Sequence, residues 1–342
     1  MSIHEINSET SYIKDKVSPA ASKRDLSLLL QKYKQSPRNR HRFCFHQGPN
    51  VDLHDIIICY DHKTYIPPNK HIGKAESLLV ISGTLDFFLF NDSGLVYDYR
   101  RLSTCDSEYP FYIRVPPNTW HGLRAVGPDP CMIKETISGP YDKSTLHWAA
   151  FAPSEADGHR VGFEWYDSVY RECETRHISA PSDEVFEKVT ELVFRSSRQL
   201  VTVSLSQLKP ILEAASKSSL KRARVCCHGG SEEKLQEMFI ALFKDVNIEE
   251  SMHLRKDESL TVISGSGRYV FPNEDGSVRE TVSLTSLADN DNDNDTSHFY
   301  ARINRYVPHK IIVDSEVMII HEATTGPFSR SDTDFRIKRF DQ

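Results

Sequence analysis

Short apolar segments separated by turn residues dominate the pattern along this chain. In its first half, five such segments are rich in β-branched and aromatic residues, with Gly, Pro, Asn or Asp between them. These segments are residues 55–60, 77–82, 84–90, 96–102 and 111–115. The tetrapeptides NDSG at 91–94 and NEDG at 273–276 are typical of hairpin turns. Many short strands joined by tight turns predict an all-β barrel or sandwich.

Apolar residues at three- and four-residue spacings predict only a few helices. Residues 25–36 and 204–218 both have this spacing, and Pro210 marks a start or a kink in the second helix. Residues 182–194 have similar spacing and open with a serine that can cap a helix. We therefore expect an amphipathic helix there as well.

The chain contains the same stretch twice. HIGKAESLLVISG at 71–83 and HLRKDESLTVISG at 253–265 are identical at nine of thirteen positions, at an offset of 182 (253 − 71). RHRFCFH at 40–46 and RARVCCH at 222–228 have the same offset. The offset grows by five residues later in the chain, and we assign the insertion to the acidic, low-complexity loop ADNDNDNDTS at 288–297. A repeat of this length indicates one structural unit used twice.

The repeat divides the chain into four predicted segments. They are an N-terminal tail (1–24), a first barrel with a metal site (25–153), a linker with a helical segment (154–203) and a second, degenerate barrel (204–342). A chain of 342 residues is long enough for two domains that each bury their own core.

Charge and cysteine usage narrow the classes of function. The net charge of −6, without a Lys/Arg block, argues against nucleic acid as a partner. No apolar run is long enough for a membrane helix, and the polar N-terminus does not read as a signal peptide. The seven cysteines form no CxxC pair, which fits free thiols in the cytoplasm. The expected partners are a small-molecule substrate and a second copy of the chain in a homodimer.

Two histidines and a glutamate in the first unit predict a metal site. Asn69 and His71 would face the same side of a strand, and Glu76 follows after a short turn. The Pro-rich segment at 115–123 supplies His121. Two imidazoles and a carboxylate are the ligands of a mononuclear first-row metal site that keeps positions open for substrate, water or oxygen.

The second unit keeps the same donor types. His253 and Glu258 match His71 and Glu76. His309 corresponds to His121, and Ser251 replaces Asn69. Because an amide oxygen is lost and the Pro-rich turn is shortened, we expect a second, weaker metal site here.

Taken together, these residues resemble the cupin superfamily and, more narrowly, two tandem copies of the WbuC family of cupin-fold metalloproteins. The resemblance is carried by the RxRxCxH segment at 40–46, Tyr65-Ile66-Pro67-Pro68, Lys74-x-Glu76, Asn91-Asp92-Ser93-Gly94, Pro116 to Trp120-His121, and Gly139-Pro140-Tyr141. It implies an all-β bicupin, that is, two tandem double-stranded β-helix (jelly-roll) barrels with short flanking helices. It also implies one divalent metal in such a barrel and an association with bacterial polysaccharide biosynthesis, without a settled reaction.

The chain departs from the family at one metal ligand. Where the family has His-x-His, this chain has Asn69-Lys70-His71, so that Asn69 becomes an optional, neutral fourth ligand. Fe²⁺ is the metal we favour, because two histidines and a carboxylate resemble the non-haem iron triad. Zn²⁺, Ni²⁺ and Mn²⁺ are compatible with the same donors.

Seven further polar or aromatic residues are candidates for chemistry or substrate binding. Proton transfer would fall to Glu135, Tyr65 or Lys74. Substrate binding would fall to Arg40, Arg42, His46 and Trp120. The alternative for each is structural: surface ion pairs for the cations, and packing for the aromatic rings and His46.

Two classes of function follow from these residues. The first is a metal-dependent enzyme acting on a sugar, a sugar-nucleotide or a hydroxy or keto acid, as an isomerase, an epimerase or an iron oxygenase. The second is a bicupin that binds a small ligand or has a structural role, without chemistry. The intact donors of the first unit favour an enzyme, whereas Asn69 and Ser251 favour a binding protein.

Overall fold

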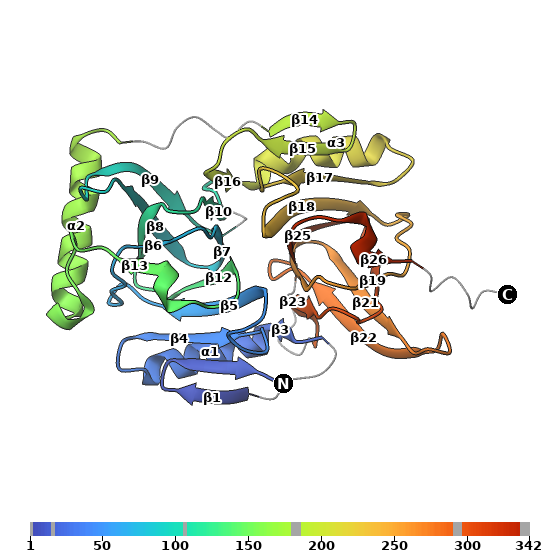
Figure 1. Ribbon diagram of the computed structural model, residues 1–342, viewed down its shortest axis with the longest axis horizontal. Helices are drawn as coiled ribbons and strands as arrows, with labels where there is room; N and C mark the ends of the chain where they lie inside the picture. Colours follow the sequence, from blue (N-terminus) through green and yellow to red (C-terminus); the bar gives the residue numbers. More distant parts are fainter. Residues whose placement is uncertain (1–2, 15–17, 105–107, 179–185, 290–295, 336–342) are drawn as a thin grey trace.

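Successive side chains of each strand point alternately into a barrel and away from it, and the chain forms two such barrels. The computed structural model describes residues 3–14, 18–104, 108–178, 186–289 and 296–335. The two barrels lie side by side, the first mainly in blue to green and the second in yellow to red (Figure 1). The all-β architecture of two tandem barrels predicted from the repeat is confirmed.

The first barrel is built mainly from the first repeat unit. Its strands are β1 (Ile3–Asn7), β2 (Thr10–Ile13), β4 (Arg40–Cys44), β5 (Leu53–Tyr60), β6 (Asn69–His71), β7 (Glu76–Ser82), β8 (Thr84–Phe90), β9 (Val96–Leu102), β10 (Tyr112–Val115), β11 (Trp120–Val126), β12 (Cys131–Ser138), β13 (Leu146–Trp148) and β16 (Val201–Val203). They form one sheet in the order β1-β2-β4-β5-β12-β7-β10-β16 and another in the order β13-β6-β11-β8-β9. A buried apolar cluster with Leu78, Phe87 and Ile113 fills the space between these sheets.

The second barrel repeats this arrangement. Its strands are β3 (Ala20–Ser22), β14 (Phe186–Thr190), β15 (Val193–Ser196), β17 (Arg222–Cys226), β18 (Leu235–Phe243), β19 (Met252–His253), β20 (Glu258–Ser264), β21 (Ser266–Pro272), β22 (Val278–Thr285), β23 (His298–Ile303), β24 (Lys310–Val313), β25 (Val317–Thr325) and β26 (Thr333–Asp334). The main sheet runs β14-β15-β17-β18-β25-β20-β23-β22-β21-β24, and β19 pairs with β26. Leu260, Tyr269 and Ile320 belong to its interior cluster.

Helices lie outside the barrels. They are α1 (Lys23–Gln35), α2 (His159–Thr175) and α3 (Lys209–Lys217), with short 3₁₀ turns η1 (Lys143–Thr145), η2 (Glu155–Asp157), η3 (Leu205–Leu208) and η4 (Arg330–Asp332). Helix α2 stands along the outer side of the first barrel (Figure 1). None of the helices in the described part of the chain has the length and apolar content needed to span a membrane.

Most local predictions are confirmed, and one is wrong. The five strand segments become β5, β7, β8, β9 and β10, and the predicted helices at 25–36 and 204–218 become α1 and η3–α3. The predicted helix at 182–194 is wrong, because residues 186–190 and 193–196 are the paired strands β14 and β15. Most of the predicted acidic loop, residues 290–295, lies outside the described residues.

Each barrel lends a strand to the other. β3, from the start of the first unit, pairs with β23 of the second barrel, while β16, from the start of the second unit, pairs with β10 of the first. Within the described residues, the predicted tail (1–24) and linker (154–203) thus contribute strands to the barrels, and the linker also contains the helix α2. Residues 3–13 and 20–22 are strands of the two sheets, and residues 186–203 contain three more.

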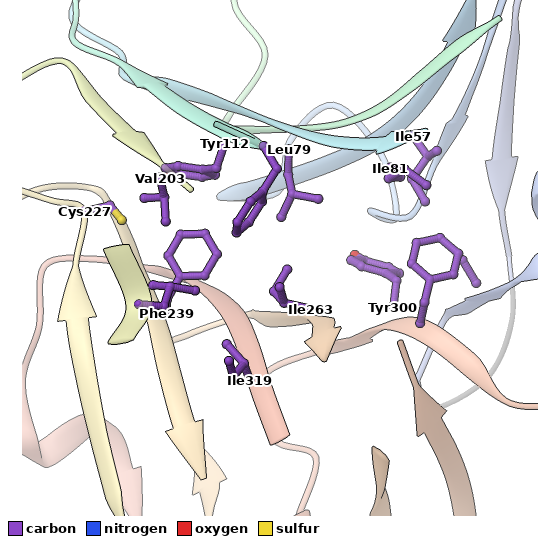
Figure 2. Close-up of a cluster of buried hydrophobic side chains, with 14 of the residues drawn as sticks. Ile57, Leu79, Ile81, Tyr112, Val203, Cys227, Phe239, Ile263, Tyr300 and Ile319 are labelled. Carbon is purple, nitrogen blue, oxygen red and sulfur yellow. The ribbon is translucent and has the colours of Figure 1, made fainter. Parts of the chain in front are cut away.

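An apolar core lies between the two barrels. Figure 2 shows Ile57, Leu79, Ile81 and Tyr112 on one side facing Phe239, Ile263, Tyr300 and Ile319 on the other. Ile57 and Phe239, like Ile81 and Ile263, occupy repeat positions 182 residues apart (239 − 57 and 263 − 81). The two units therefore meet through the same face, related by the internal repeat.

Two buried ion clusters cross this interface. Asp55 of β5 accepts hydrogen bonds from Ser259 Oγ (3.0 Å) and Arg302 Nη1 (2.8 Å) of the second barrel, and Lys134 Nζ lies 3.3 Å away. Burial alone would raise the pKa of Asp55, but the two cations outweigh burial and lower it. At the matching position, Glu237 is paired with Arg114 of the first barrel.

Replacing Asp55 with alanine leaves Lys134 as a buried cation without a carboxylate partner among the described residues, and leaves Arg302 with Asp257 alone. We expect Asp55→Ala to lower the free energy of unfolding by about 3–5 kcal/mol, measured by urea denaturation. Asp52→Ala is the matched control, because Asp52 also pairs across the barrels, with Arg305, but its side chain is 53% exposed. Its cost should be only about 0–1 kcal/mol. Equal small losses in both variants would contradict a structural role for the buried cluster.

Candidate metal centres

The three predicted ligands of the first barrel meet at one point in its interior. β6 and β11 pair so that His121 lies opposite Asn69, and β7 begins with Glu76 beside them. His71 Nε2 lies 2.7 Å from Glu76 Oε2, and His121 Nε2 lies 2.8 Å from Glu76 Oε1. All three donor atoms are within 4.8 Å of one another. The structure thus brings together donors that are up to 50 residues apart in sequence (121 − 71).

The hydrogen bonds of the histidine rings determine which nitrogen faces the carboxylate. His121 Nδ1 lies 2.9 Å from the carbonyl oxygen of Thr119, which can only accept, so we assign the proton of the neutral ring to Nδ1. Its Nε2 lone pair then faces a lone pair of Glu76. Two acceptors at this distance need a cation between them, either a proton or a metal ion. A backbone carbonyl that fixes the metal-binding tautomer is a common feature of histidine metal sites.

An unsatisfied buried atom lies beside the triad. Asn69 Oδ1 is buried and has no hydrogen-bond partner among the described residues, and Asn69 lines the same cavity as the triad. Buried amide oxygens rarely stay without a partner. A metal held by His71, Glu76 and His121 could satisfy this oxygen, so these residues fit the ion that the sequence predicts. Whether Asn69 is a ligand remains a prediction.

A second carboxyl group in this cavity has a raised pKa. Glu135 of β12 lines the cavity, and burial together with the charge of Glu76 raises its pKa to about 7. The pKa of Glu76 itself is lowered, because His121 and His71 outweigh its burial. The two carboxyls therefore differ in protonation at neutral pH, which makes Glu135 able to exchange a proton there.

The cavity around the first triad is small. Its volume is about 70 Å³, with Tyr60, Ile66, Leu123 and Ile133 among its walls. Pockets that bind organic ligands measure roughly 300–1,000 Å³. The first barrel thus has room for an ion but not for a sugar or an aromatic acid.

Three predicted site residues lie outside this cavity. Tyr65 packs against helix α2, and its hydroxyl donates to the carbonyl oxygen of Pro153 at 2.6 Å. Lys74 Nζ donates to the carbonyl oxygen of Pro140. Trp120 Nε1 donates to Asp92 Oδ1 at 2.9 Å. The structure thus places these three side chains away from the triad, and their roles in proton transfer and substrate binding stay predictions without support from the cavity.

The predicted basic substrate site of the first barrel is also closed. Arg40 is buried, with Nε 3.3 Å from Glu9 and Nη1 2.7 Å from Glu155, so it serves as a structural ion pair. His46 is buried and stacks on His54 at 4.2 Å. Burial lowers the pKa of His46 to about 3, so the ring has no positive charge to attract an anion. These contacts favour structural roles for both residues, and their substrate-binding roles stay predictions. Arg42 lies near Glu135 and partly offsets the rise in its pKa, but it does not line the cavity.

The second barrel contains a matching triad. His253 Nε2 lies 2.9 Å from Glu258 Oε2, and His309 Nε2 lies 4.0 Å from Glu258 Oε1. The donor atoms again lie within 4.8 Å of one another. His309 Nδ1 is 2.9 Å from the carbonyl oxygen of Val307, which leaves its Nε2 free for a metal by the same argument as in the first barrel. The predicted second set is therefore assembled, and its lower metal affinity remains a prediction.

One residue of this second centre was missed by the sequence analysis. The hydroxyl of Tyr269 donates to Glu258 Oε1 at 3.0 Å and fixes the carboxylate. Phe87, 182 residues earlier (269 − 87), stands at the matching position and stacks on His121 instead. The signal was present in the repeat alignment as a Phe-to-Tyr change on the strand that follows the repeated glycine.

The second triad opens into a large cavity. Its volume is about 780 Å³, and it is lined by all three donors together with Tyr269 and Glu322. Burial and the charge of Glu258 raise the pKa of Glu322 to about 8. The second barrel therefore combines a metal-type triad, a protonated carboxyl and room for an organic molecule.

Comparisons with known proteins agree with this architecture. Salicylate 1,2-dioxygenase from Pseudaminobacter salicylatoxidans is 12% identical over 98% of this chain and 90% of its own, with a TM-score of 0.56. A point mutant of the same enzyme gives 12% identity, coverage of 92% and 86%, and a TM-score of 0.59. The fold is that of a bicupin. At this identity the likeness shows the fold alone, and the narrower WbuC resemblance remains a prediction.

A family model matches the chain at both repeats. It is described as a domain of unknown function (DUF6016) and matches residues 21–102 and 203–284. The two matches begin in β3 and β16 and include the first histidine and the glutamate of each triad, in agreement with the repeat unit. No curated protein matches the chain.

Metal binding at both triads should depend on pH. Burial lowers the pKa of His71 and of His253, but in each ring the neighbouring glutamate outweighs burial and raises the pKa above the ordinary 6.5. A metal must displace that proton, so its affinity falls as the pH falls. We expect Zn²⁺ to bind at least about fourfold more weakly at pH 6 than at pH 8. Chelator competition, corrected for the chelator's own protonation, measures this difference, and an affinity independent of pH would contradict imidazole ligation.

Proposed function

We propose that this bicupin is a metal-dependent enzyme whose substrate binds in the second barrel. The observation that carries the proposal is the joining of His253, Glu258 and His309 to a cavity of about 780 Å³. Enzyme pockets are usually large concave sites that contain a few convergent polar groups and carboxyls with shifted pKa values. The second barrel combines these features.

The triad would hold one divalent metal, and the remaining groups have separate tasks. When bound, the metal would polarise a substrate oxygen or bind dioxygen, and Fe²⁺, Zn²⁺, Ni²⁺ and Mn²⁺ are all compatible with the donors. Tyr269 holds the Glu258 carboxylate in position through its hydrogen bond. Glu322, with a pKa of about 8, would donate or accept the proton that the substrate gains or loses. Isomerisation and epimerisation by proton transfer require such a group, and an oxygenation can use one.

The first barrel would hold a metal in a structural role. Its cavity of about 70 Å³ excludes an organic substrate, so Glu135 is a weaker candidate for proton transfer than its counterpart Glu322. The better-preserved sequence motif of the first barrel predicts catalysis there. The volumes of the two cavities favour the second barrel instead.

Two variants separate the roles of the triads. His121→Ala and His309→Ala should each remove one equivalent of metal, measured by elemental analysis of the purified protein after loading with Zn²⁺. His121→Ala should lower the melting temperature, because a metal that binds only the folded state stabilises it. Equal metal content in wild type and both variants would contradict metal binding at the triads.

Two carboxyl variants test the site of catalysis. The wild type, loaded with each of the four metals, is screened for oxygen uptake and for product by NMR on a panel of sugars and of hydroxy and keto acids. On any substrate found, Glu322→Gln should lower kcat by at least about 100-fold without loss of metal, because a positioned proton donor contributes about 10²–10⁴-fold. Glu135→Gln should stay within about threefold of wild type.

The reverse pattern would place catalysis in the first barrel. A protein that binds metal and ligand but turns over nothing on the panel would favour the alternative of a bicupin that binds a small molecule without chemistry. A cytoplasmic location and a homodimeric state remain predictions.

A further inference from the structure

Arg40 and Arg42 of the first barrel correspond to Arg222 and Arg224 of the second (222 − 40 = 182), and the ion pairs of the first residue of each pair differ. In the first barrel, Glu9 of the turn between β1 and β2 and Glu155 of η2 bind Arg40, and Arg38 pairs with the same two glutamates. The four side chains close the barrel at this edge. Arg40 is therefore neutralised and cannot bind a further anion.

In the second barrel, Arg222 stands at the position of Arg40. Arg222 and its neighbour Arg224 are exposed, and neither has an ion-pair partner among the described residues. Glu191 lies in the turn between β14 and β15, where Glu9 lies between β1 and β2, but it pairs with Lys188 at 2.7 Å. The glutamate that closes the first barrel is thus turned away in the second.

Both arginines line the cavity that contains the second triad. They are two residues apart on β17, so both side chains leave the same face of the strand, while Ala223 and Val225 pack into the core between the barrels. Arg224 lies near enough to Glu322 for its positive charge to lower the pKa of that carboxyl, against the larger effect of burial. The cavity therefore has a pair of cations on one wall and the metal-type triad on another.

Most of the remaining wall is apolar. Its aliphatic side chains include Leu192, Leu220, Ile240, Ile248, Ile311 and Ile320. A sugar would leave hydroxyl groups against these side chains without hydrogen bonds, at a cost in free energy. A molecule with an apolar body and one anionic group would satisfy both kinds of wall.

We propose that the second barrel binds an organic acid, with its carboxylate on Arg222 and Arg224 and its apolar body against the aliphatic wall. Guanidinium groups match the planar geometry of a carboxylate and can form two parallel hydrogen bonds to it. This assignment narrows the proposed function, on which it rests for the role of the triad, to acids rather than sugars. The body of the acid lies between the arginine pair and the triad.

Benzoate is a suitable probe, because it has one carboxylate and a rigid apolar body. We expect it to bind the Zn²⁺-loaded full-length protein in isothermal titration, and Arg222→Gln and Arg224→Gln should each weaken it by about tenfold or more. Arg279→Gln is the charge-matched control, because Arg279 is exposed on β22 of the same barrel and does not line the cavity. It should leave benzoate affinity unchanged.

Two further probes test the two parts of the ligand. Benzamide has the same shape without the charge, and inorganic phosphate has the charge without the apolar body. Both should bind at least about tenfold more weakly than benzoate. Phosphate binding as tight as benzoate would overturn the assignment to an apolar acid.

Metal removal distinguishes this proposal from the proposed function. If benzoate binding survives metal removal and depends on Arg224, the acid site is supported. That result together with a protein that takes up no metal would mean that the proposed function fails while the acid site stands. If benzoate binding needs the metal and is unchanged in both arginine variants, the carboxylate ligates the metal and the arginine site is rejected, while the proposed function survives.

Discussion

The charge of two buried carboxylates is the constraint on which the rest of this structure depends. Glu76 and Glu258 are 5% and 6% exposed, and each faces two imidazole rings. A buried anion is costly unless it is paired, and a neutral imidazole that presents a lone pair does not pair with it. For His121 and His309, whose Nε2 atoms we assign as lone pairs, a cation is needed between the ring and the carboxylate. A shared divalent metal ion would meet this need in both barrels.

One strand in each barrel connects the metal site to the barrel interface. On β7, Glu76 points into the first barrel, and Ser77 beside it donates to Glu237 of the second barrel at 2.5 Å. On β20, Glu258 and Ser259 repeat this arrangement, with Ser259 donating to Asp55. Because successive side chains of a strand point to opposite faces, fixing one fixes the other. The interface thus orients both metal sites, and the exchanged strands β3 and β16 hold it closed.

The fold and the triads could be predicted because their signals are local or repeated. Strand segments follow from β-branched runs bounded by turn residues, and the spacing of His71 and Glu76 recurs at His253 and Glu258. The helix predicted at 182–194 failed because Val189 and Val193 fit helical spacing as well as a strand. Tertiary pairing decided between the two, since β15 extends the sheet beside β17.

The accessibility of each site could not be predicted, because it depends on contacts between distant segments. Arg40 is neutralised by Glu9 and Glu155, which lie 31 and 115 residues away (40 − 9 and 155 − 40), and no motif marks either contact. The sequence motif predicts that Tyr65 lies near the cavity. In the structure its ring instead packs against Gly162 of α2. The better-preserved motif thus lies in the closed barrel, and the more divergent copy lies in the open one.

The most direct test of this account is anomalous diffraction from crystals of the Zn²⁺-loaded protein at the zinc edge. The account predicts one peak in each barrel, about 2.0–2.2 Å from the Nε2 atoms of His71 and His121 or of His253 and His309, and from the neighbouring glutamate oxygen. Crystals without a peak in either barrel, in which the histidines stay hydrogen-bonded directly to Glu76 and Glu258, would contradict it.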